Sequence, residues 1–126
     1  MAYTATVTVT PIGREAVLVT IAETDARDTS EAEIPLGFQH GRVHRQKCAL
    51  SAGTGSTIDP ILGEASEPSG NDLVVENDAA AVQVDNAVTA GTTFSTGNGS
   101  LYHRSQPNDT AEDHTITTVY HITKGW

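Results

Sequence analysis

The stretch His114–Trp126 reads HTITTVYHITKGW and alternates at a period of two. One side of the predicted strand carries Ile116, Thr118, Tyr120 and Ile122. The opposite side carries Thr115, Thr117, Val119, His121 and Thr123. Such β-branched and aromatic residues suit a pleated, half-buried surface. We therefore predict a strand here, around which the rest of the chain is organised.

A similar ribbon lies near the other end of the sequence, where apolar residues and threonines alternate strictly from residue 3 to residue 10. Threonine is over-used throughout, with 18 copies, which favours strands with a solvated Thr face over helices. Two such ribbons indicate one sheet framework that contains both.

Further strands follow from local patterns. Residues 15–22 are apolar on both faces, which predicts an interior strand buried on two sides. Residues 29–35 alternate apolar and acidic side chains, as expected at an acidic sheet edge. The other predicted strands and hairpins are 42–51, then 72–76 with 80–85 across Asn77-Asp78, and 92–95 with 101–104 across Asn98-Gly99. Residues 53–70 are predicted to form a long loop, pinned by Ile58, Ile61 and Leu62.

Short strands separated by turn signals, with no amphipathic helix, predict an all-β fold. We expect a single antiparallel β-sandwich domain over residues 1–126, jelly-roll-like and with long loops.

Charge excludes some classes of partner. The net charge of −9 argues against nucleic acid and against anionic membranes, because both require a basic face. The sequence shows no signal peptide and no apolar run long enough to span a membrane, so we expect folding in a cytosol. The single cysteine, Cys48, shares a predicted strand face with His44, Gln46 and Leu50, and we expect it to be a buried, inert thiol.

No catalytic or metal-binding pattern stands out. The five histidines form no HxH or HExxH motif, and the Gly-rich run SAGTGS (51–56) lacks the context of a phosphate-binding loop. We predict no enzyme activity, no metal site and no cofactor.

The clearest departure from the acidic background is a basic run. Arg42, Arg45 and Lys47 lie within one predicted strand, where they form either a solvated face or a contact with an acidic partner. Trp126 follows Lys124-Gly125 and is a candidate anchor in a neighbouring molecule. Tyr120 completes the interface candidates.

Together these features resemble the small virion proteins of tailed bacteriophages, and capsid decoration (cement) proteins in particular. The resemblance rests on the short Thr- and Gly-rich acidic β-chain and on the closing stretch SLYHRSQPNDTAEDHTITTVYHITKGW (100–126). It implies a structural protein, made in the host cytoplasm, that binds the major capsid protein on the outer head surface and stabilises the shell, commonly as a homotrimer. It assigns no site residue.

Three alternatives stay open. One is a tail accessory protein. Another is a carbohydrate- or receptor-binding sandwich with a concave face that includes Tyr102, Tyr120 or Trp126. The third is a small enzyme of cupin type, which would require several histidines to converge inside a barrel.

Overall fold

The computed structural model describes residues 3–27, 29–52, 56–66, 68, 73, 82–108 and 114–125, the side chains of 88–90 excepted. All strands in this part of the chain pair antiparallel, as predicted. The strands are β1 Thr4–Pro11, β2 Ala16–Thr24, β3 Ala32–Pro35, β4 His40–Ala52, β5 Ile61–Gly63, β6 Gln83–Ser95, β7 Ser100–Arg104 and β8 Thr115–Lys124.

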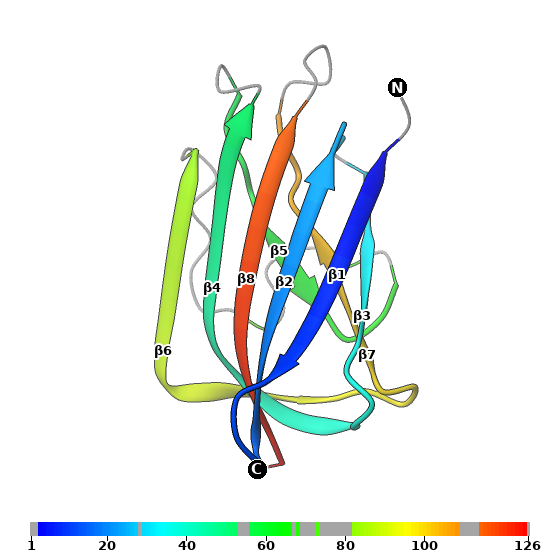
Figure 1. Ribbon diagram of the computed structural model, residues 1–126, viewed down its shortest axis with the longest axis vertical. Coiled ribbons are helices and arrows are strands. Elements are labelled where there is room, and N and C mark those ends of the chain that lie inside the picture. The colour runs from blue at the N-terminus through cyan, green and yellow to red at the C-terminus, as the bar shows by residue number, and fades with distance from the viewer. Residues whose placement is uncertain are drawn as a thin grey trace.

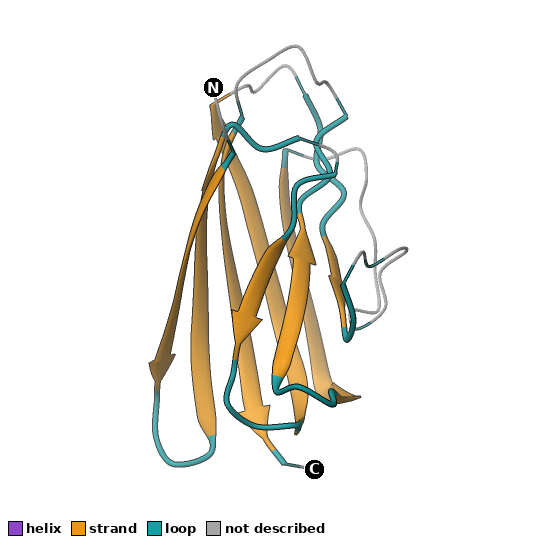
Figure 2. Cartoon of the chain, turned by 90° about the vertical axis from the view of Figure 1, so that its right-hand side faces the viewer, coloured by secondary structure: helices purple, strands orange, loops and turns teal. Residues whose placement is uncertain are grey.

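The strands form two layers. The larger sheet has the order β1-β2-β8-β4-β6, and the smaller has the order β3-β7-β5. Figure 1 shows the larger sheet in front of the smaller one, and Figure 2 shows the same layers from the side. The predicted all-β sandwich is confirmed, whereas the jelly-roll-like order and the single domain stay predictions.

β8 lies at the centre of the larger sheet, between β2 and β4. Its inward face is the predicted one, because Ile116, Thr118, Tyr120 and Ile122 are all 0% exposed. β1, the N-terminal ribbon, belongs to the same sheet but is separated from β8 by β2. The single framework that the two ribbons predicted is therefore confirmed.

β2 is buried on one face only, which corrects the prediction of burial on both. Val19, Ile21 and Glu23 face inward, whereas Leu18 is half-buried and Ala22 is exposed on the outer face. The smaller sheet covers only the inner side of β2, and no described strand packs on its outer side. An apolar run reveals hydrophobicity but not which layer covers it.

The turn at Asn98-Gly99 does not close a hairpin, which corrects a second prediction. β6 pairs with β4 in the larger sheet, whereas β7 lies between β3 and β5 in the smaller one. The Gly99 carbonyl accepts hydrogen bonds from the backbone N–H groups of Leu36 and Gly37. The turn is thus a crossing between the layers, because each flanking strand obtains its backbone partners elsewhere.

The predicted loop over residues 53–70 contains a short strand. β5, Ile61–Gly63, pairs with β7, so the loop prediction is wrong at this point. Ile58, Ile61 and Leu62 are buried, as predicted. Residues 72–76 of the first predicted hairpin lie outside the described residues, apart from the buried Leu73. Residues 92–95, predicted as a separate strand, form the last part of the long strand β6.

The interior contains two separate apolar clusters. The larger draws on both sheets, with Ile21 and Ile122 from one layer and Ile34 and Leu101 from the other. The smaller is built around residues such as Cys48, Ile58 and Ile116. Polar side chains are also fully buried in this interior.

Gly41 in β4 tests the packing among β4, β6 and β8 of the larger sheet. A Cβ atom at Gly41 would collide with the Thr123 carbonyl oxygen and lie 2.7 Å from Cζ of the buried Phe94. We expect Gly41→Ala to lower the free energy of unfolding in urea by about 1–3 kcal/mol, because the interior is already close-packed.

Gly97→Ala is the matched control, because a Cβ atom there meets nothing within 4 Å. Its effect should stay within about 0.5 kcal/mol. Equal stability of the two variants would contradict the packing described here.

Candidate functional site

A chain of buried polar side chains crosses the interior between the two sheets. Glu23 on β2, His103 on β7 and Tyr120 on β8 are each 0% exposed. His103 Nδ1 lies 2.6 Å from the Tyr120 hydroxyl, and His103 Nε2 lies 2.7 Å from Ser105 Oγ. Ser105 Oγ donates to Glu23 Oε1 at 2.6 Å. We call Glu23, His103, Ser105 and Tyr120 the buried polar chain.

Two amides and a second tyrosine extend the buried polar chain. Asn86 Nδ2 donates to Gln46 Oε1, and Gln46 Nε2 donates to the Tyr120 hydroxyl, both at 3.0 Å. At the other end, the Tyr3 hydroxyl donates to Glu23 Oε2 at 2.7 Å. The connected groups come from five strands and the adjoining coil, so the chain ties both sheets together.

The hydrogen bonds of the buried polar chain are donated in one direction, from Tyr120 towards Glu23. Because Tyr120 accepts from Gln46, its single hydroxyl proton is available to His103 Nδ1. We therefore assign the ring proton of His103 to Nε2, which donates to Ser105, and Ser105 donates in turn to Glu23. Every donor in the series then points towards the Glu23 carboxylate, which is satisfied without a second charge.

This arrangement differs from a catalytic triad. In a triad, serine and carboxylate lie on opposite nitrogens of the histidine ring. Here Ser105 Oγ and Glu23 Oε1 both lie near His103 Nε2, at 2.7 and 3.3 Å. The other ring nitrogen of His103, Nδ1, is hydrogen-bonded to the Tyr120 hydroxyl. All four side chains are buried, so they form a hydrogen-bonded part of the core and expose no nucleophile to solvent.

The surroundings shift several pKa values. Burial raises the pKa of Glu23, but hydrogen bonds from His103, Ser105 and Tyr3 outweigh it. The pKa therefore lies below its ordinary value of 4.5. Burial also raises the pKa of the Tyr120 hydroxyl well above 10.0, so this group remains a donor.

A second candidate site lies on the outer face of the larger sheet. The register of β4 shifts between Val43 and Arg45, which marks a β-bulge. Its extra residue, His44, was expected on the face of Cys48. Instead, His44 Nε2 lies 2.8 Å from Thr123 Oγ1, and the His44 and His121 rings are 5.4 Å apart on the outer face. The bulge thus adds His44 to the outward side of β4.

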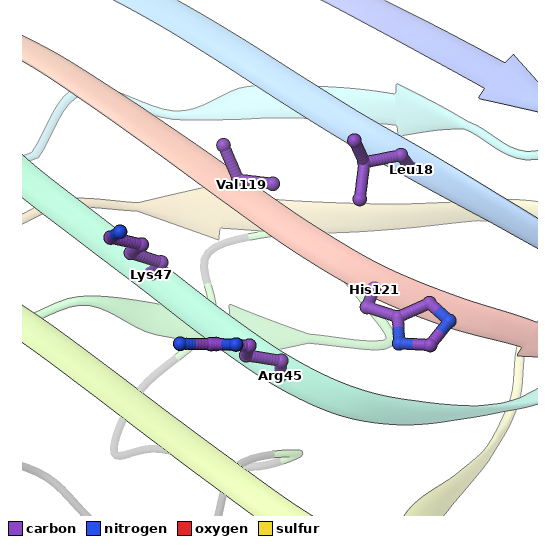
Figure 3. Close-up of a pocket in the computed structure, with 5 residues that line it drawn as sticks. All are labelled: Leu18, Arg45, Lys47, Val119 and His121. Atoms are coloured by element: carbon purple, nitrogen blue, oxygen red, sulfur yellow. The ribbon is translucent and has the colours of Figure 1, made fainter.

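Figure 3 shows the hollow that this face forms. Leu18 of β2 and Val119 of β8 supply apolar surface, and Arg45, Lys47 and His121 surround it. The open hollow has a volume of about 340 Å³. We call these five residues the outer groove.

Arg45 is fixed in place by an acidic neighbour. Its Nε and Nη2 donate to Asp85 Oδ1 and Oδ2 at 2.8 and 2.6 Å, a bidentate pair. This bond raises the pKa of Arg45 and lowers the pKa of Asp85. Both side chains stay accessible, at 53% and 40%, so the pair contributes orientation more than stability.

The interface candidates separate into three groups. Arg45 and Lys47 are exposed and line the outer groove, and the half-buried Arg42 lies further along the same strand. Tyr120 is fully buried, so its prediction as an interface residue is wrong: its hydroxyl is bonded in the core. Trp126 lies outside the described residues.

The sequence pattern did not predict the buried polar chain, although one signal was present. Glu23 has the same parity as Val19 and Ile21, which places a carboxylate on the apolar face of β2. Such a position requires buried hydrogen-bond donors. Nothing local to Glu23 indicates that these donors are Tyr3, His103 and Ser105.

Cys48 is buried, as predicted, and accepts a hydrogen bond from Thr118 Oγ1 at 3.2 Å. Within the described part of the chain, no group of three or more His, Cys, Asp or Glu residues could hold a metal ion. The same residues include no helix of the length and apolarity needed to cross a membrane.

Comparison with known proteins gives no further assignment. No family model, no curated protein and no solved structure matches this chain.

The lowered pKa of Glu23 predicts an acid-sensitive contribution to stability. Because the folded-state pKa lies below the ordinary value, the contribution is complete above about pH 4.5 and is lost as the pH falls through the folded-state pKa. We expect the free energy of unfolding of Glu23→Gln to fall less between about pH 5 and pH 3 than that of the wild type.

The exposed Glu15→Gln removes the same charge and should retain the wild-type pH slope. Urea titrations at several pH values measure all three proteins. Identical slopes for Glu23→Gln and wild type would contradict the role given to this carboxylate.

Burial raises the pKa of the Cys48 thiol to about 12. We expect no reaction of the folded protein with a thiol-specific disulfide reagent at about pH 8, and complete reaction in denaturant, because the thiolate is the nucleophile. Rapid labelling of the folded protein would contradict the burial of Cys48.

Proposed function

We propose that this chain is a structural virion protein that binds the outside of a tailed-phage head, as a decoration protein does. The outer groove is the surface that we assign to this binding. The supporting observation is the placement of Arg45 and Lys47 beside apolar Leu18 and Val119 on one open sheet face.

Charge distribution supports this assignment. The whole chain carries −9, yet three of its seven Lys and Arg residues lie on β4. A basic patch on an acidic protein orients it towards an acidic surface, while the remaining charge repels other copies. The partner that fits the groove is therefore an acidic protein surface with an apolar centre, which we take to be a major capsid protein.

The rigidity of the groove also supports binding. Its residues lie on β2, β8 and β4, which are the three inner strands of the larger sheet. The Asp85 pair holds the guanidinium of Arg45 in one orientation. A preorganised surface loses little side-chain freedom on binding, which suits a protein that repeats one contact over a shell.

The carbohydrate-binding alternative is less well supported. Of the three aromatic residues suggested for its concave face, Tyr120 is buried in the core. The Tyr102 hydroxyl accepts a hydrogen bond from Asn98 Nδ2. The outer groove itself is lined by aliphatic and basic residues and offers only the His121 ring for stacking against a sugar.

The test uses expanded empty heads assembled from the major capsid protein encoded in the same genome. We expect the wild type to cosediment with these heads in a saturable, salt-sensitive way. Arg45→Glu and Lys47→Glu should each weaken binding by about tenfold or more, because they place like charges against the acidic partner.

Arg14→Glu is the matched control, since it makes the same charge change in the exposed turn between β1 and β2. It should bind like the wild type. Wild-type protein that does not bind the heads, or equal weakening by all three variants, would overturn the proposal. Unfolding in urea should show that the variants remain folded.

A further inference from the structure

The four edge strands of the sandwich are not equally protected against pairing with another chain. β3 has Glu33 and Pro35 within four residues, and β5 is only three residues long. β6 carries Asp85 and bends near Gly91, which has a positive φ of 78°. Charge, proline, bends and short length are the usual means by which edge strands avoid association.

β1 has little such protection. It runs for eight residues, TATVTVTP, with no charged side chain and a proline only at its last position. Most of its residues are exposed, and only Val7 and Val9 are half-buried. Such an edge is a ready template for another strand.

The register shows which backbone groups face outward. The Ile12 N–H donates to the Ala16 carbonyl at 2.9 Å, which makes these two residues a hydrogen-bonded pair. Hydrogen-bonded pairs alternate along an antiparallel ladder, so the even-numbered residues of β1 bond to β2. The backbone groups of Ala5, Val7, Val9 and Pro11 therefore point away from the sheet.

Proline occurs where this pattern allows it. Pro11 has no N–H group and lies at an outward position, so the ladder with β2 loses no hydrogen bond. The sheet order places β1 at the edge, and among the residues described no strand pairs with its outward side.

We propose that β1 pairs antiparallel with β1 of a second copy, around a two-fold axis at Val7. Val7 then lies opposite its own counterpart, and Ala5 lies opposite Val9. In this register every outward N–H group of both strands meets an outward carbonyl. Pro11 then lies opposite Tyr3, just outside β1, whereas a register centred on Thr8 would place Pro11 opposite Ala5 and leave a carbonyl within β1 unpaired.

A second copy is the occupant that best fits this edge. In the Val7 register, threonine meets threonine on the outer face, and alanine or valine meets valine on the inner face. An isologous contact needs such self-complementarity. Because β1 is uncharged, the contact brings no like charges together locally, although each copy carries −9.

The result would be one continuous sheet through two molecules, a dimer and not the trimer implied by the resemblance to decoration proteins. This inference does not rest on the proposed function. The dimer should tighten as salt is raised, because screening reduces the repulsion between two acidic molecules.

The test exploits the cross-strand pair of Thr6 and Thr8. In the proposed register, Thr6 of one copy lies opposite Thr8 of the other, with both side chains on the outer face. Thr6→Lys with Thr8→Lys therefore sets lysine against lysine twice. Thr6→Lys with Thr8→Glu sets lysine against glutamate twice, so it is the matched control.

Sedimentation velocity over a concentration series measures the dimer dissociation constant. We expect a wild-type dimer, an increase of about tenfold or more for the lysine–lysine variant, and a change within about threefold for the lysine–glutamate variant. The lysine–lysine variant has the lower net charge, so overall repulsion alone would predict the opposite order.

Three outcomes would overturn the proposal. The first is a wild type that stays monomeric at about 100 µM, a concentration far above a typical functional dissociation constant. The others are a wild-type trimer and a dimer that the lysine–lysine variant leaves intact. Urea unfolding of each monomer should confirm that both variants fold, since Thr6 and Thr8 face the uncharged Ala22 and Thr20 across β2.

Discussion

The Glu23 carboxylate is the constraint on which this sandwich depends. A buried charge is strongly unfavourable unless the protein supplies donors, and here they come from Tyr3, Ser105 and His103. These donors reach Glu23 only when β1, β2 and β7 are in their observed positions. Shifting β2 by one residue would move Glu23 to the outer face and leave His103 and Ser105 without their acceptor.

The buried polar chain and the two apolar clusters hold the sandwich in different ways. Hydrophobic contacts are tolerant of sliding, whereas hydrogen bonds have direction and length. A sandwich held by both is stable as a unit and specific in register. This stiffness is useful for a protein whose outer groove and β1 edge would have to keep a fixed relation while separate molecules contact them.

The strands of this fold could be predicted from the sequence because alternation is a local property. The inward face of β8 and the acidic outer side of β3 follow directly from parity. Which strands pair with each other is not a local property. The turn at Asn98-Gly99 therefore predicts a hairpin, although its flanking strands belong to different sheets. The bulge beside His44 changes parity within one strand, and no residue type there signals it. The network at Glu23 depends on residues about 80 positions away, which periodicity does not reach.

The position of β8 has a consequence for synthesis. It follows all the other described strands in the sequence, yet it separates β2 from β4 in the finished sheet. During translation, β1 and β2 can form a hairpin, but the larger sheet cannot close until β8 leaves the ribosome. Until then the inner edges of β2 and β4 stay unpaired, and assembly depends on contacts that are distant in sequence. Folding of this sheet should accordingly be slow, and until β8 has been synthesised the nascent strands should depend on chaperones that shield open strand edges.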